Sequence, residues 1–169
     1  MLRLNIKYSY WKGKEKKMVI NKNIIHSPVN GTIKPIQNCS DAMFAQQMLG
    51  ESVLITPSNN EIYAPFDGEI CMLFETKHAI GIRNDNNIEL LIHIGVNTVN
   101  LGGRFFTSLK KQGEKVLKGD KILSVDFESI NDEGYDSDVI VIITENPAKY
   151  NYKKVDCDQI VTNQVPIFE

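Results

Sequence analysis

Turn signals recur along the whole of this sequence, and they divide it into short β-prone runs. Asn30-Gly31, Asp67-Gly68 and Gly102-Gly103 are three of them, and strong helical periodicity is scarce between such points. Asn, Asp and Gly tolerate the positive φ that tight hairpin turns require. Many short strands separated by turn residues are typical of all-β sandwiches and barrels. We therefore expect an all-β fold, an antiparallel β-sandwich with short helical turns.

Length and composition predict one globular domain. The 169 residues are 42% hydrophobic and 24% charged, and we assign residues 21–169 to a single β-sandwich. Residues 1–20 form a basic segment that we expect to be a flexible tail, with at most weak contact to an anionic membrane surface; the alternative is sequence upstream of a start at Met18. The net charge of -2 argues against a nucleic-acid partner. Three widely spaced cysteines favour a reduced, cytoplasmic setting.

A short internal sequence repeat suggests that two similar turns belong to the same β-sheet structure. The segments 25–33 and 62–70 both read Ile-x-small-Pro-x-(Asn/Asp)-Gly-x-Ile. We interpret His26, in the first copy, as a surface turn residue. The best helical stretch is 41–49, which begins at a Ser40 or Asp41 cap and ends at Gly50.

Two histidines lie in neighbouring β-prone runs, 74–83 and 88–96, which flank a polar loop of four residues. If Arg83 pairs with Ile88, paired residue numbers sum to 171, and His78 and His93 satisfy that sum. Their Cβ atoms would then lie about 4.5–5.5 Å apart on one face of a hairpin. A register slip of one residue would move one of them to the other face, so the inference depends on the loop length. Gly95, two residues after His93, would leave room beside the ring.

Facing imidazoles disfavour double protonation, so at least one ring is expected to be neutral. A neutral ring has the free lone pair that a nucleophile or a metal ligand needs. One imidazole could accept a phosphoryl group while the other stabilises its oxygens. The alternative is zinc bound by His78 and His93, but a closed zinc site needs more ligands and no third one is evident.

Several motifs in family order resemble the glucose-type enzyme IIA (EIIA) proteins of the bacterial phosphoenolpyruvate-dependent sugar phosphotransferase system, with hints of the β-glucoside and trehalose branch. They include Ser-Pro-Val-Asn-Gly at 27–31, Asp-Ala-Met-Phe-Ala at 41–45, Phe-Glu-Thr-Lys-His-Ala at 74–79, Leu-Ile-His-Ile-Gly at 91–95 and Gly-Tyr-Asp at 134–136. The resemblance implies a phosphohistidine carrier without an organic cofactor. It implies that His93 accepts phosphate on Nε2 from HPr and passes it to the IIB domain of a sugar permease.

The same resemblance implies roles for neighbouring residues. A backbone carbonyl near Gly95 holds the other ring nitrogen of His93, His78 contacts the phosphoryl group and supports onward transfer, and Thr76 hydrogen-bonds His78. Asp41 is expected to meet an arginine of HPr. An apolar docking patch is expected at the matching positions, which are Met43, Phe44, Met48, Phe74 and Val99, with Gly95 and Asn97 beside them. Asn97 stands where the family usually has Asp, and the loss of that charge would retune docking.

Two other functions compete with the carrier. In the first, the protein is a phosphorylation-dependent binding module that controls transporters, kinases or other metabolic enzymes. In the second, it is a zinc hydrolase of related sandwich topology, which lacks the expected additional His and Asp motifs. A zinc ion bound by His78 and His93 at a partner interface also remains compatible with the carrier.

Overall fold

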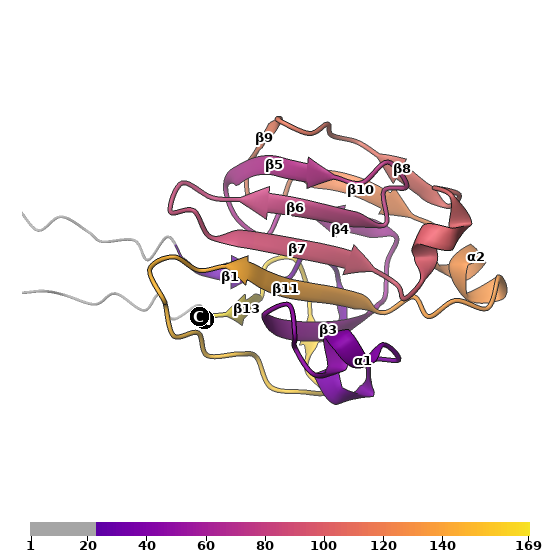
Figure 1. Cartoon of the computed structure of the whole chain (residues 1–169), viewed down its shortest axis with the longest axis horizontal. Coiled ribbons are helices and arrows are strands. Elements are labelled where there is room, and N and C mark those ends of the chain that lie inside the picture. The colour runs from indigo at the N-terminus through magenta and orange to yellow at the C-terminus, as the bar shows by residue number, and fades with distance from the viewer. Residues whose placement is uncertain (1–22) are drawn as a thin grey trace, which may run out of the picture.

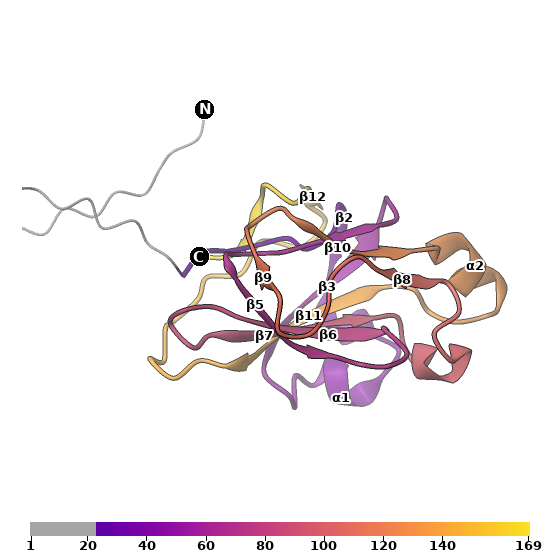
Figure 2. The same cartoon turned by 90° about the horizontal axis from the view of Figure 1, so that it is seen from above.

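The computed structural model describes residues 23–169, and the predicted basic tail of residues 1–20 lies outside this part of the chain. The described residues form a two-layered β-sandwich in which all strand pairs are antiparallel (Figures 1 and 2). The predicted fold class is confirmed. Within 23–169 there is no helix of the length and apolarity that a membrane crossing requires.

The largest sheet has eight strands in the order β12-β2-β3-β11-β7-β6-β5-β9. In that order the strands span Ile160–Val161, Gly31–Lys34, Glu51–Pro57, Val139–Glu145, Glu89–Ile94, Ala79–Arg83, Gly68–Leu73 and Lys115–Val116. Seen from above, β6, β7 and β11 lie in one layer, while β12 and β2 lie in the other beside β10 (Figure 2). The sheet is therefore strongly curved, so that its β12 end returns over its own centre.

Two smaller sheets complete the sandwich. One contains β4 (Glu61–Tyr63), β10 (Lys121–Val125) and β8 (Phe106–Ser108), and the other pairs β1 (Ile25–His26) with β13 (Pro166–Phe168). The helical elements are short: η1 (Ile36–Asn38), α1 (Ala42–Ala45), η2 (Thr98–Leu101) and α2 (Phe127–Asp132). Figure 2 shows α1 outside the sandwich, below the layer that contains β11 and β7.

Strand β7 separates two hydrophobic clusters. Leu90, Ile92 and Ile94 point inward and belong to the main core between the layers. Leu91 points outward and packs against a smaller cluster on the outer face, which includes Phe44 of α1. The alternation follows from the two-residue period of a strand. The same alternation places His93, two residues after Leu91, on the outer face.

The two Pro-containing repeats lie side by side. His26 N donates to Pro65 O at 3.1 Å, and Tyr63 N donates to Pro28 O at 2.7 Å, so each copy bonds to the other. This confirms that they belong to one structural unit. The interpretation of His26 as a surface turn residue was wrong: it lies in β1, is half-buried, and its buried Nδ1 atom has no hydrogen-bond partner. Burial and the nearby charge of Lys118 lower its pKa.

The predicted helix 41–49 is shorter in the structure. Asp41 caps α1 by accepting from Met43 N at 2.7 Å, as expected, but the α-helix covers only Ala42–Ala45. Gln47 adopts a left-handed φ of 54°, which ends the right-handed helix before Gly50. The following turn places Met48 and Leu49 on the surface, where 69% and 44% of their areas are exposed.

Candidate functional site: a facing pair of histidines

The β6–β7 hairpin carries both histidines, but its register differs by one residue from the prediction. Ala79 pairs with His93 and Arg83 pairs with Glu89, so paired numbers sum to 172 and not to 171. The cause is the loop. Asn84 accepts hydrogen bonds from the backbone N–H of Asn86 and of Ile88 through its side chain, each at 3.0 Å, which holds five residues between the strands instead of four.

The two imidazole rings nevertheless meet. Their centroids are 5.1 Å apart and their planes make an angle of 81°. His78 lies in the bend just before β6, where Lys77 has a left-handed φ of 58°. Because the bend is outside the strand, His78 is not bound by strand alternation, and its ring reaches the outer face. Its backbone remains attached to the sheet, since Ile94 N donates to His78 O at 2.8 Å.

His93 is held through the backbone. Its Nδ1 atom lies 2.9 Å from Gly95 O, as the resemblance implied. A carbonyl can only accept, so Nδ1 carries the proton and Nε2 keeps its lone pair. The ring of Phe44 packs against His93 with centroids 4.8 Å apart. These contacts orient one nucleophilic nitrogen in a half-buried ring.

His78 is held through side chains. The Thr76 hydroxyl lies 2.6 Å from His78 Nδ1, and the Phe74 ring meets the imidazole edge at 5.2 Å. The imidazole is buried, with 6% of its surface exposed. A hydroxyl can donate or accept, so this contact by itself leaves both tautomers of His78 accessible.

Both rings are shifted toward the neutral form. Burial, the larger cause, and the charge of a protonated His78, the smaller one, together lower the pKa of His93 to about 4. The Gly95 carbonyl and the Asp41 carboxylate act against this shift. Burial also lowers the pKa of His78. A neutral His93 is the form that a nucleophile requires.

Four of the predicted docking residues are exposed, and one of them, Phe74, contacts the ring of His78. Met43, Met48, Phe74 and Val99 expose 45%, 69%, 43% and 48% of their surfaces. Phe44 differs, since only 8% of it is exposed and it supports the His93 ring from the side of α1. Leu49, which was not predicted as a docking residue, adds to the exposed apolar surface.

Gly95 and Asn97 have backbone reasons for their identity. Gly95 is buried with a φ of 72°, and an added Cβ atom would overlap Thr98 and the Asp136 carbonyl. The expectation that Gly95 leaves room beside the His93 ring was therefore wrong, because the space of the missing side chain is filled by Thr98 and the Asp136 carbonyl. Asn97 is exposed and left-handed, with a φ of 60°, a conformation that Asn and Asp adopt more readily than other side chains.

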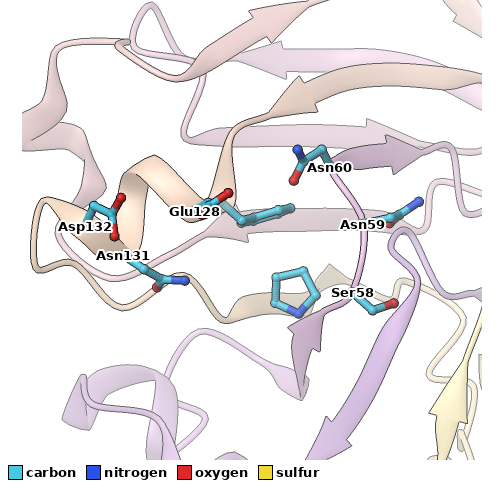
Figure 3. A pocket seen from close by; sticks show the side chains of 8 residues that line it. Ser58, Asn59, Asn60, Glu128, Asn131 and Asp132 are labelled. Carbon is cyan, nitrogen blue, oxygen red and sulfur yellow. The ribbon is translucent and has the colours of Figure 1, made fainter.

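The histidine pair is also distinct from the pocket that lies between α2 and the β3–β4 turn (Figure 3). That pocket has a volume of about 310 Å³ and contains no histidine; it is lined by Pro57, Ser58, Asn59, Asn60, Phe127, Glu128, Asn131 and Asp132. Among residues 23–169, no three His, Cys, Asp or Glu side chains are grouped so as to hold a metal ion.

An antiparallel sandwich that carries two neighbouring histidines on its outer face, one of them with an unprotonated Nε2, has the geometry that a group-transfer protein requires. The comparisons specify the family. The family model described as "phosphoenolpyruvate-dependent sugar phosphotransferase system, EIIA 1" matches residues 23–149. The chain therefore belongs to this EIIA family. EIIA domains of the family are phosphoryl carriers between HPr and the IIB domain, so the chain is a phosphotransferase component of the system.

Individual relatives agree with the family. The chain is 41% identical to the β-glucoside-specific EIIBCA component of Bacillus subtilis over 80% of its length, and spans 22% of that larger protein. It is 38% identical to the glucose-specific EIIA component of Oceanobacillus iheyensis, covering 85% of the chain and 87% of the relative. The solved glucose permease IIA of Mycoplasma capricolum superposes with a TM-score of 0.80 at 32% identity, covering 86% of this chain and 93% of that one.

Proposed function

We propose that His93 is the phosphoryl acceptor, receiving the group on Nε2 from phospho-HPr and passing it to the IIB domain of a sugar permease in the cytoplasm. The observation that carries the proposal is the contact between His93 Nδ1 and Gly95 O at 2.9 Å. It leaves Nε2 unprotonated, and the pKa near 4 keeps the ring neutral at pH 7.

The transfer is a displacement at phosphorus. The Nε2 lone pair forms a new N–P bond as the N–P bond of the donor phosphohistidine breaks, and the donor nitrogen recovers its electron pair. The proton stays on Nδ1 of His93, which keeps donating to the Gly95 carbonyl. This hydrogen bond stabilises the positive charge that the imidazole ring gains when Nε2 is phosphorylated. No organic cofactor takes part, because the phosphoryl group moves directly between imidazoles.

His78 is proposed to stabilise the phosphoryl oxygens and to support onward transfer. If the Thr76 hydroxyl donates to His78 Nδ1, the remaining proton is on Nε2 of that ring and is available to donate to an oxygen anion. The close approach of the two rings supports this assignment.

Partner docking is proposed on the exposed apolar side chains Met43, Met48, Phe74 and Val99, with Asp41 as the charged contact for an arginine of HPr. Apolar surface excludes water from the phosphohistidine, whereas the acid sets association rate and partner choice. Asn97 supplies no charge, so docking of HPr depends on Asp41 to a larger extent. The relatives named for glucose and for β-glucosides support a permease for one of these sugar types.

The same exposed patch is compatible with a regulatory role as a second candidate. Met48 and Leu49 are exposed in the chain without a phosphoryl group, so transporters or metabolic enzymes could bind the unphosphorylated protein there. Binding that disappears on phosphorylation would identify this role, and it would coexist with transfer.

The test is to incubate the protein with phosphoenolpyruvate, enzyme I and HPr, and to map the acid-labile label. We expect label on His93 and none in His93→Gln. His26→Gln is the matched control and should be labelled at the wild-type rate, since His26 lies in β1 and outside the pair. Normal labelling of His93→Gln would refute the assignment.

A further inference from the structure

The backbone that holds His93 is itself fixed on both sides. Thr98 Oγ1 donates to Ile94 O at 2.5 Å, Gly95 N donates to Asp138 O at 3.0 Å, and Val96 N donates to Asp136 O at 2.9 Å. The Gly95 carbonyl lies between these anchors and accepts from His93 Nδ1. Its direction therefore depends on the position of the 136–138 segment.

The Asp136 carboxylate determines where that segment lies. Its Oδ1 accepts from Asp138 N at 3.0 Å, which closes a local turn, and its Oδ2 accepts from Ser40 Oγ at 2.7 Å. The two acceptors of the 136–138 segment, the Asp136 and Asp138 carbonyls, are thereby held at the spacing that Val96 N and Gly95 N require.

The bond to Ser40 connects this segment to the second support of His93. Ser40 directly precedes Asp41, the cap of α1, and α1 carries Phe44 against the imidazole ring. The Asp136 carboxylate is thus linked to both groups that contact the ring of His93, which are the Gly95 carbonyl at Nδ1 and the Phe44 ring. Asp136 does not touch His93 itself.

We propose that Asp136 is a positioning residue for phosphoryl transfer, which holds the Gly95 carbonyl on His93 Nδ1 and thereby keeps the lone pair on Nε2. The inference rests on the proposed role of His93 as acceptor. It concerns hydrogen-bond geometry and not charge: Asp41 is the carboxylate whose charge acts on the His93 pKa.

The experiment measures the tautomer of His93 by ¹⁵N NMR in the unphosphorylated full chain, together with the initial rate of labelling by phospho-HPr. The variants are Asp136→Ala, Asp136→Asn and Ser40→Ala, with Asp132→Ala, an exposed acid of α2, as the control. In the wild-type protein we expect the Nδ1–H tautomer alone.

In Asp136→Ala we expect a mixture with the Nε2–H tautomer and a labelling rate lowered about 2- to 10-fold, the range for the loss of one hydrogen bond. Asp136→Asn should stay near wild type, because the amide oxygen still accepts from Asp138 N and the amide nitrogen can donate to Ser40. Ser40→Ala should shift the tautomer in the same direction by a smaller amount. Asp132→Ala should change neither quantity.

A wild-type tautomer in Asp136→Ala overturns the proposal, and so does an equal shift in Asp136→Asn, which would assign the effect to charge. If Asp136→Ala does not fold, Ser40→Ala decides, and an unchanged tautomer there overturns the proposal. Failure of the acceptor assignment is recognised separately, because it appears as label at another residue in the wild-type chain, whereas the tautomer is read without phosphorylation.

Discussion

The two histidines of the pair are held by different parts of the fold. His93 belongs to a strand with neighbours on both sides, since it pairs with Ala79 of β6 and Ile140 of β11, and its Nδ1 atom faces a backbone carbonyl. His78 belongs to a bend at the edge of β6, and its Nδ1 atom faces the hydroxyl of Thr76. One ring is thus fixed by the sheet and the other by a side chain.

The difference matches the two tasks. His93 takes the phosphoryl group from one partner and gives it to another, so the same ring nitrogen must be nucleophilic in both steps. The Gly95 carbonyl can only accept a hydrogen bond, and it therefore keeps the proton on Nδ1 and the lone pair on Nε2. His78 must stabilise a phosphoryl group that is first gained and then lost by His93. The Thr76 hydroxyl can donate to or accept from His78 Nδ1, so either tautomer of His78 can form. The comparison therefore predicts that changes at His93 affect labelling, while changes at His78 affect onward transfer.

The strongest test of this division is His78→Gln. We expect label to form on His93 but its transfer to the IIB domain to fall by about 100-fold, a typical effect of removing one group that stabilises developing charge. Label formation and chase should be timed in separate single-turnover reactions. Equal losses in both reactions would remove the distinction between acceptor and helper.

Gly95→Ala tests the backbone side of the comparison. The added Cβ would overlap the Thr98 side chain and the Asp136 carbonyl, so we expect labelling of His93 to fall about 10-fold or more as the carbonyl moves from Nδ1. Gly102→Ala is the matched control, because it has a similar φ of 62° with open space at its Cβ. It should cost about 1 kcal/mol of unfolding free energy from the left-handed backbone and leave labelling intact.

Thr76→Val tests the side-chain side. The substitution keeps the shape but removes the hydroxyl, so we expect onward transfer to slow about 2- to 10-fold with labelling unchanged. Thr76→Ser should recover most of the rate, since it restores the hydroxyl. A slower labelling step in Thr76→Val would show that His78 also serves the acceptor reaction.

The smallest expected effect is on titration. Because a protonated His78 lowers the pKa of His93, His78→Gln should raise the pKa of His93 above its value of about 4. Burial is the larger cause and persists, so the pKa should stay below 6.5. The NMR titration of the His93 ring measures this, and a pKa at or below the wild-type value would contradict the coupling.

The same pKa values predict how stability changes with pH. The unfolded chain binds protons to both histidines near pH 6.5, whereas the folded chain resists protonation of His93 until about pH 4. Stability from this group is therefore complete above about pH 6.5 and is lost as pH falls toward 4. Denaturant unfolding of wild type and His93→Gln between pH 7 and 4 should show the smaller acid sensitivity in the variant.

The sequence predicted the fold class and the histidine pair for sound physical reasons, because turn residues and two adjacent β-prone runs are local signals. The register was wrong by one because Asn84 folds its side chain over the loop, which no count of residues reveals. The rings met despite this error because the bend at Lys77 released His78 from strand alternation.

Tertiary contacts explain the other differences. In the sequence, Phe44 and Met43 are adjacent apolar residues of the same short helix, and nothing there separates a buried role from an exposed one. Only the packing of Phe44 against His93 and the outer cluster shows that it supports the ring rather than forming part of the docking surface. The Pro-containing repeat suggests a surface turn at His26, yet His26 lies in β1, which pairs with β13, and is half-buried. Asp136 belongs to the Gly-Tyr-Asp motif at 134–136, but neither that motif nor the segment around Ser40, 96 positions away, indicates the hydrogen bond between them.

The outer-face position of His93 also limits what phosphorylation can communicate. The ring lies on the side of β7 opposite Leu90, Ile92 and Ile94, and its backbone is bonded to strands on both sides. A phosphoryl group added there points away from the main core between the layers, so we expect the phosphorylated and unphosphorylated proteins to have the same backbone structure. Partners would then distinguish the phosphorylated from the unphosphorylated protein by the charge at His93 and not by a change in conformation.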